Sequence, residues 1–320
     1  MRHVVLFGFV LAVICGQISA SAGEFFSDDS NVEELWNDGE FTEGVAVRSD
    51  GIVFFSDILR DPQKPGQILQ FNPETGKTTV FAADSRKSNG LFFAPSERLL
   101  AACGANGGAM ALCEVTKRGK VRPVVQRFGG KRFNAPNDLV VHPNGGVYFS
   151  DPRYIGPEPI ELDHQSVYRY DLKTKSLTRV TTDIEKPNGV HTSPDGKTLY
   201  VAETNNGSTG QNPDVEAKYG RMTLNAFDVA EDGSLSNKRV LVNFGDQLGT
   251  DGMAIDPNGN IFAAVRSESR FGIVVYSPEG KELDYLKTPS LPTNCCFGVG
   301  ENSKTLYLTA GGGLYRVKVR

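Results

Sequence analysis

One short unit recurs six times along the 320-residue chain, and this repetition constrains the fold more than any other feature. Each copy opens with an acidic or amide residue, continues with a short apolar run, reverses at a polar turn and ends with a second apolar run. This pattern is typical of a β-hairpin. The opening residues, called openers below, are separated by 43 to 63 residues, and they are Glu43, Asn89, Asn137, Asn188, Asp251 and Asn294.

A second hairpin follows the opening one in five of the six units, so a complete unit supplies four strands. These second hairpins occupy residues 66–84, 109–128, 165–183, 221–244 and 271–287. A repeat of about 40 to 50 residues with four strands indicates a propeller blade. The sequence therefore predicts an all-β fold, a six-bladed β-propeller with four-stranded blades.

The sixth unit is one strand short, because the chain ends at Arg320 soon after its third strand. Residues 32–38 precede the first unit and belong to no repeat of their own. They stand before Glu43 where the fourth strand of each blade stands before the next opener. We therefore expect Leu35 and Trp36 to lie in the outermost strand of the last blade, closing the ring and removing an exposed edge.

The first 22 residues have the pattern of a secretory signal peptide, with Arg2 before an apolar run and small residues at the cleavage site. A lipoprotein anchor at Cys15 is disfavoured because Ile14 stands where a small residue is required. We expect residues 23–320 to form one exported propeller, periplasmic or secreted. Without the peptide, the balance is 33 basic to 38 acidic residues. Nothing here calls for nucleic acid, a membrane surface or an obligate protein partner.

Strand direction predicts where a binding site lies. If each opener begins the innermost strand of its blade, all openers sit at one mouth of the central channel. The connections between second and third strands end on the same face, and they are long at residues 57–66, 152–165 and 204–220. Long loops on a rigid scaffold commonly build binding sites. We expect residues 204–220 to form a mobile lid.

The openers carry the chemistry. Glu43, Asn137, Asn188 and Asp251 bring two carboxylates and two amides around one axis, with Asn89 and Asn294 completing the circle. Hard oxygen ligands suit a divalent cation, and Ca²⁺ accepts such a mixed set in loose geometry. The alternative is that each opener merely caps backbone groups at a strand start.

The motifs around the openers resemble those of the gluconolactonase, or senescence marker protein, family. They are Glu43-Gly44, Asn134 to Asp138 with Tyr148 to Pro152, Lys186 to Val190, Thr250 to Met253 and Pro292 to Gly298. The resemblance implies a six-bladed propeller with a central calcium and hydrolysis of lactones.

By motif position, the resemblance makes Glu43, Asn188 and Asp251 metal ligands and places Asn137 at both metal and substrate. Asp138 follows as in relatives and is a substrate-binding candidate. Some members carry a substrate-binding arginine two residues before that asparagine, where this chain has Ala135. The nearest arginine, Arg132, is the candidate substrate contact in its place.

The implied mechanism is polarisation of a lactone carbonyl by the cation, with Asp251 activating water and Glu43 as the second carboxylate available. Two alternatives stay open. One is a non-catalytic propeller that binds a ligand or partner and keeps calcium for structure, and the other is an organophosphate ester hydrolase. The three histidines beyond residue 22 share no motif, which gives no support to a zinc site or a serine triad.

Cys103 and Cys113 flank a short glycine-rich connection between neighbouring strands. In an exported protein they could form a disulfide, and as small hydrophobic residues they could equally remain buried thiols. Adjacent Cys295 and Cys296 must point to opposite faces of their strand.

Overall fold

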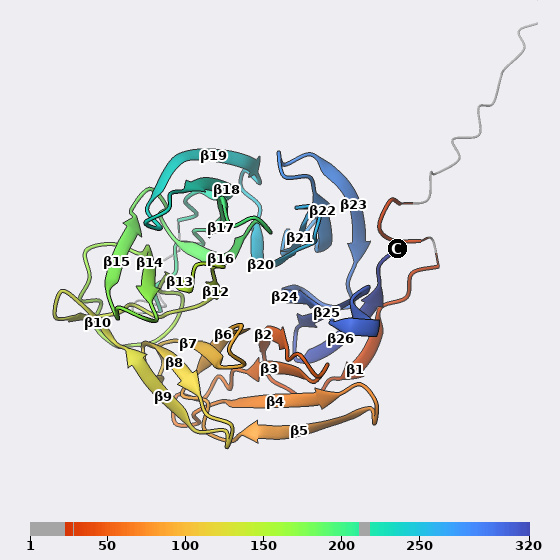
Figure 1. Cartoon of the computed structure of the whole chain (residues 1–320), viewed down its shortest axis with the longest axis horizontal. Coiled ribbons are helices and arrows are strands. Elements are labelled where there is room, and N and C mark those ends of the chain that lie inside the picture. Colours follow the sequence, from red (N-terminus) through yellow and green to blue (C-terminus); the bar gives the residue numbers. More distant parts are fainter. Residues whose placement is uncertain (1–22, 28, 211–217) are drawn as a thin grey trace, which may run out of the picture.

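Six four-stranded antiparallel sheets surround a common axis (Figure 1), in a computed structural model that describes residues 23–27, 29–210 and 218–320. In each sheet the first strand of the unit lies nearest the axis and the last lies at the rim. The predicted all-β six-bladed propeller is confirmed. The predicted signal peptide, residues 1–22, lies outside the described residues, as does the part of the predicted lid at 211–217.

The strands are given blade by blade, from the axis outward. Blade 1 has β2 (Thr42–Val47), β3 (Val53–Asp57), β4 (Gln67–Asn72) and β5 (Lys77–Ala82). Blade 2 has β6 (Ser88–Phe93), β7 (Leu99–Cys103), β8 (Ala111–Val115) and β9 (Val121–Val125). Blade 3 has β12 (Leu139–Val141), β13 (Gly146–Asp151), β14 (Ser166–Asp171) and β15 (Leu177–Thr181). Blade 4 has β16 (Pro187–Thr192), β17 (Thr198–Thr204), β18 (Met222–Val229) and β19 (Leu235–Asn243).

Blade 5 has β20 (Thr250–Ile255), β21 (Ile261–Val265), β22 (Gly272–Tyr276) and β23 (Glu282–Lys287). Blade 6 has β24 (Pro292–Phe297), β25 (Thr305–Ala310), β26 (Gly313–Lys318) and β1 (Glu33–Trp36). A two-stranded ribbon of β10 (Arg127–Phe128) and β11 (Lys131–Arg132) precedes blade 3. The 3₁₀ turn η1 (Gly300–Asn302) joins β24 to β25. Among the described residues, no helix is long and apolar enough to cross a membrane.

Burial follows position in the blade. Every residue of β3 and β13 is buried, whereas β5 and β15 are mostly half-buried or exposed. The second strands are covered on both faces by neighbouring blades, and for that reason they read as continuous apolar runs rather than as alternating patterns. The sharp turns between first and second strands use glycine at positive φ, as at Gly145, whose φ is 89°.

The ring closes through strands from opposite ends of the chain. β1 pairs antiparallel with β26, and the Trp36 ring packs on Phe55 of blade 1 with ring centroids 5.4 Å apart. The expected place of Leu35 and Trp36 in the outermost strand of the last blade is confirmed. Residues before β1 add to the closure, since the Asp284 carboxylate accepts the backbone N–H groups of Phe25 and Phe26 at 2.7 and 2.9 Å.

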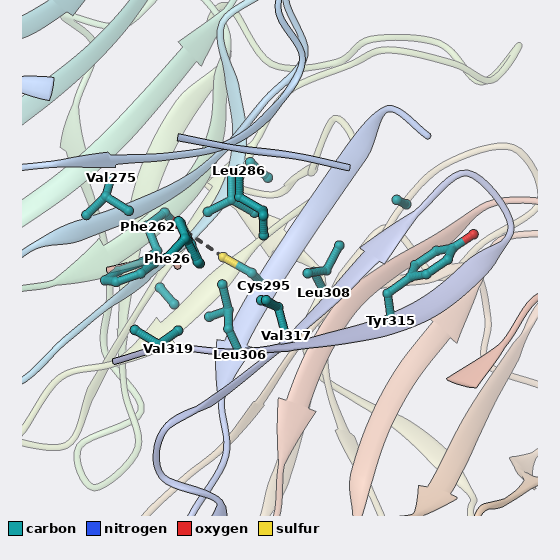
Figure 2. Close-up of a cluster of buried hydrophobic side chains, with 14 residues drawn as sticks. Phe26, Phe262, Val275, Leu286, Cys295, Leu306, Leu308, Tyr315, Val317 and Val319 are labelled. Atoms are coloured by element: carbon teal, nitrogen blue, oxygen red, sulfur yellow. Dashed lines mark hydrogen bonds between the residues drawn. The ribbon is translucent and has the colours of Figure 1, made fainter. Parts of the chain in front are cut away.

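The apolar packing between blades 5 and 6 includes a residue that precedes β1 and a residue that follows β26 (Figure 2). Phe26 lies beside Phe262 of β21, with ring centroids 6.2 Å apart, and Val319 belongs to the same buried cluster. In this cluster the Cys295 thiol donates to the carbonyl of Phe262 at 3.2 Å. The described segments that precede β1 and follow β26 therefore pack against the ring.

The cysteines of the described residues are free thiols. Cys103 and Cys113 belong to one buried apolar cluster. In the register of β7 and β8, Ala101 faces Cys113 and Cys103 faces Ala111, so the two cysteines are diagonal neighbours. Of the two possibilities left open by the sequence, this structure contains the buried thiols.

The closure generates a first prediction. Trp36 is the single tryptophan of the chain, so its fluorescence reports on β1 alone. Because detaching β1 would expose the edge of β26 and open the ring, we expect β1 and the rest of the propeller to unfold together. In urea titrations, the midpoints from tryptophan fluorescence and from far-UV circular dichroism should coincide. A fluorescence transition at clearly lower urea would show that closure contributes little to the ring.

Candidate functional site

A cavity of about 280 Å³ opens at one mouth of the channel, and openers from five blades line it. These side chains come from strands far apart in sequence and meet because each innermost strand starts at the same end of the ring. Residues of the three long connections form much of its walls. The openers in the cavity are Glu43, Asn89, Asn137, Asn188 and Asp251.

Asn294 does not line this cavity, which corrects the sixth place of the predicted circle. In blades 1, 2, 4 and 5 the residue before the opener pairs with a residue at the end of the second strand. In blade 6 that pair is Pro292 with Ala310, so the equivalent place belongs to Thr293. The Thr293 hydroxyl is buried and donates to the carbonyl of Thr42 at 2.8 Å. Asn294 comes one residue later.

The residue after the opener lies one layer deeper in the channel. Asn294 and Asp138 both occupy this place and line a narrower space below the cavity. The other blades have glycine here, and a Cβ on Gly90 or Gly252 would lie only 2.4 Å from the Asp138 Oδ1 atom or 2.2 Å from the Asn294 Cγ atom. The channel therefore has room for few side chains at this level.

Asp138 thus lies below the cavity that it was predicted to serve. Its Oδ2 atom accepts the backbone N–H of Val190 at 3.1 Å, which ties blade 3 to blade 4. Burial raises the pKa of Asp138 to about 7. Arg132, the other predicted substrate contact, does not line the cavity either, because its guanidinium Nε donates to Glu161 at 2.5 Å.

Three buried carboxylates hold the chain segments that lead to openers. Each stands at or next to the end of a second strand and accepts the backbone N–H of the residue three positions before the opener of its own blade. The three blades with such a carboxylate are those with long connections between the second and third strands. In the other three blades, the corresponding residue of the second strand is Cys103, Val265 or Ala310. The pairs are Glu40 with Asp57 at 2.9 Å, Asn134 with Asp151 at 2.9 Å and Glu185 with Glu203 at 2.6 Å.

The cavity floor contains two buried carboxyl groups. Glu43 and Asp251 are buried, and the pKa of Glu43 is raised well above its usual range by burial and then by the Asp251 charge. Burial also raises the pKa of Asp251, against the opposing effects of Arg266 and Asn188. The nearby Tyr154 hydroxyl has a raised pKa, from burial and then from these two carboxylates. Because each negative charge disfavours the other, a cation bound nearby would stabilise both carboxylates.

Sequence reasoning missed several cavity residues. Arg266 follows β21, donates from Nη1 to Asp251 Oδ2 at 3.1 Å and lies over the Phe41 ring at 5.8 Å. Lys87 is buried, and its ammonium donates to the carbonyls of Leu59 and Asp61. Their positions in the repeat could have predicted them, because such residues lie just before an opener or just after a second strand.

The described histidines stay apart from the cavity. His142 Nε2 lies 2.7 Å from the carbonyl of Gly196, His191 Nδ1 lies 2.9 Å from its neighbour's carbonyl, and His164 Nδ1 lies 3.0 Å from Ser166 Oγ. Within the described part of the chain, no three His, Cys, Asp or Glu side chains gather closely enough to hold a metal ion. A cation at the floor would therefore depend on the amide oxygens as well as on Glu43 and Asp251.

That donor set fits a hard divalent cation. Five oxygen-bearing side chains line the floor, and two of them are carboxylates. The Asp251 carboxylate accepts a hydrogen bond from Arg266, and Glu43 Oε2 accepts one from the backbone N–H of Gly44 at 3.2 Å. Calcium accepts such mixed carboxylate and amide ligands and completes its shell with water.

A family model for the SMP-30/gluconolactonase/LRE-like region matches residues 41–312, which include blades 1 to 5 and strands β24 and β25 of blade 6. The chain belongs to this family. The resemblance inferred from the motifs is confirmed. The matched span starts two residues before Glu43 and ends in blade 6, so it includes the whole floor of the cavity.

The chain is similar to a gluconolactonase of Zymomonas mobilis, with 28% identity over 311 residues that cover 90% of this chain and 81% of the relative. It also superposes on the structure of a gluconolactonase from Xanthomonas campestris with a TM-score of 0.77 and 27% identity, covering 92% of this chain and 90% of the other. A calcium-binding regucalcin from Agrobacterium tumefaciens has a TM-score of 0.68 at 18% identity, covering 91% and 95%, and shares the fold.

The buried carboxylates generate a second prediction. Asp151 accepts two backbone N–H groups, from Asn134 and Ala135, at 2.9 and 2.8 Å. Asp151→Ala leaves both donors buried without an acceptor, which should cost about 2 to 4 kcal/mol at pH 5. Asp171 is a matched control, because it accepts two backbone N–H groups in an exposed turn. Asp171→Ala should cost less than about 1 kcal/mol in urea unfolding.

The penalty for Asp151→Ala should also depend on pH. Burial raises the pKa of Asp151 to about 7, above the value of an unfolded aspartate. The stability linked to this group is therefore fully present below about pH 4 and is lost as pH rises through 7. The difference between the parent protein and the variant should shrink over that range. A penalty that grows with pH would contradict a buried, proton-retaining Asp151.

Proposed function

We propose that this protein is a calcium-dependent hydrolase that opens lactone rings. The observation that carries the proposal is the floor of carboxylate and amide oxygens from Glu43, Asn137, Asn188 and Asp251 in an open cavity. The relatives named gluconolactonases support it, since they share the fold and about a quarter of the residues. Export of the protein is part of the proposal and rests on residues 1–22 alone.

Glu43, Asn137, Asn188 and Asp251 would hold the cation. A calcium ion bound there supplies a Lewis acid that polarises the lactone carbonyl and stabilises the charge that develops on its oxygen. The solved regucalcin is described as a calcium-binding protein, which agrees with this choice of metal. Asn89 also lines the floor and is available as a hydrogen-bond donor to the substrate.

Asp251 would remove the proton from the attacking water. Its Oδ2 atom accepts from Arg266 at 3.1 Å, which orients the carboxylate at the cavity floor. The water oxygen bonds to the carbonyl carbon, the ring C–O bond breaks, and the proton taken by Asp251 passes to the departing alkoxide. Atoms balance with water as the sole co-reactant, and the product is a hydroxy acid.

A lactone panel followed by acid release tests the proposal. We expect hydrolysis with calcium, loss of turnover in excess chelator and a lower melting temperature without the metal, because a ligand bound to the folded state stabilises it. Asn188→Ala should weaken calcium binding more than Asn89→Ala, since the family resemblance makes only Asn188 a ligand.

Three outcomes would each contradict a part of the proposal. Calcium binding without hydrolysis of any lactone would favour a propeller whose metal is purely structural. An unchanged melting temperature in chelator, together with no metal by elemental analysis, would remove the calcium site. Equal calcium affinities for the Asn188→Ala and Asn89→Ala variants would undo the ligand assignment.

Substitution of Asp251 by asparagine separates its two roles. An amide oxygen can still ligate calcium, but an amide cannot accept a proton from water at neutral pH. We therefore expect Asp251→Asn to lower kcat by about 10²- to 10⁴-fold even at saturating calcium. Stopped-flow or pH-indicator assays over a calcium titration give the measurement. If kcat recovers at high calcium, Asp251 is a ligand only, and Glu43 is the next candidate base.

A further inference from the structure

The cavity has two chemically different parts. Its floor is made of carboxylate and amide oxygens, while much of its wall is carbon. The wall side chains come from segments before openers and from the long connections between second and third strands. They include Phe41, Ile58, Pro136, Tyr154, Ile155 and Leu248.

Several polar groups in the wall already form hydrogen bonds with the protein. The Tyr154 hydroxyl donates to the carbonyl of Thr204 at 3.1 Å, and the Thr204 hydroxyl donates to the carbonyl of Thr250 at 2.7 Å. The Lys87 ammonium donates to two backbone carbonyls of the connection at residues 57–66. A hydroxyl group of a ligand that lies against this wall would lose its bound water and would find few free polar atoms with which to form a new hydrogen bond.

The arginines near the cavity are also engaged. Arg266 donates to Asp251 and, at 3.3 Å, to the carbonyl of Pro292. Arg132 donates to Glu161. A polyhydroxylated ring loses water from each hydroxyl on binding, and each hydroxyl left without a partner costs free energy. The wall thus favours an apolar substituent over a sugar ring.

Ile155 is the side chain that shows this most directly. It lines the cavity, yet 51% of its surface is exposed to solvent. The segment around Ile155 is fixed by the buried Arg153, whose guanidinium donates to the carbonyls of Asn134, Gly156 and Glu158. An exposed aliphatic side chain fixed at a cavity mouth gains stabilisation when an apolar ligand covers it.

We propose that the substrate is a lactone carrying an apolar alkyl or aryl substituent, with its carbonyl at the oxygen floor and its substituent against Phe41, Tyr154 and Ile155. This inference rests on the proposed lactonase function and narrows its substrate class. It makes Ile155 a specificity-determining residue. A polyhydroxylated sugar lactone is the poorer substrate.

Three lactones with the same six-membered ring test the proposal: unsubstituted δ-valerolactone, δ-nonalactone with its butyl chain, and glucono-1,5-lactone with its hydroxyls. With calcium present, kcat/KM for δ-nonalactone should exceed that for δ-valerolactone by about tenfold or more, the low end for added methylene groups in an apolar pocket. It should also exceed that for glucono-1,5-lactone.

Ile160 supplies a matched control for Ile155. Both isoleucines lie in the connection at residues 152–165, and Ile160 is 36% exposed but does not line the cavity. Ile155→Asn should lower kcat/KM for δ-nonalactone by about fivefold and leave that for δ-valerolactone within about twofold. Ile160→Asn should change neither. Both sites are exposed, so both variants should keep the parent's melting temperature to within a few degrees.

The failures are distinguishable. A higher kcat/KM for glucono-1,5-lactone than for δ-nonalactone overturns the apolar substrate class and leaves the lactonase function standing. Equal losses in the Ile155→Asn and Ile160→Asn variants overturn the placement of the substituent. If none of the three lactones is hydrolysed in the presence of calcium, the proposed function fails and this inference fails with it.

Discussion

The cavity depends on a hydrogen bond that is repeated in three blades, from a backbone N–H to a buried carboxylate at the end of the second strand. Asp57, Asp151 and Glu203 each accept this bond from the residue three positions before an opener. A buried N–H without an acceptor costs about 1 to 3 kcal/mol, so the bond specifies one path for the chain. That path places Glu43, Asn137 and Asn188 at the floor of one cavity.

Ring closure and cavity geometry are linked. The floor takes its oxygens from five blades, so its shape depends on every blade keeping its angle to the next. The pairing of β1 with β26 joins an early and a late segment of the chain within one sheet, and the Trp36 ring packs on Phe55 of blade 1. A rigid closed scaffold can hold two carboxylates close together, an arrangement that would otherwise be relieved by local movement.

Much of this arrangement could be predicted from the repeats. The period, the hairpin turns and the missing last strand indicated six blades and closure by Leu35 and Trp36. The error at Asn294 shows where such reasoning stops. Asn294 and Thr293 are adjacent polar residues, and the β-bulge that decides which one occupies the opener position depends on pairing with Ala310. A one-residue difference in register moves a side chain to another layer of the channel.

The sequence by itself determined the fold, the end of the ring at which the openers gather and the oxygen character of the floor, because these follow from local patterns repeated in each unit. Tertiary structure alone decided which polar groups remain available. Arg132 looked suited to a substrate, yet it pairs with Glu161, while Arg266 carried no motif and contacts Asp251. The apolar wall likewise combines Phe41, Ile155 and Leu248 from three blades. Such contacts join residues distant in the chain, and no short-range pattern encodes them.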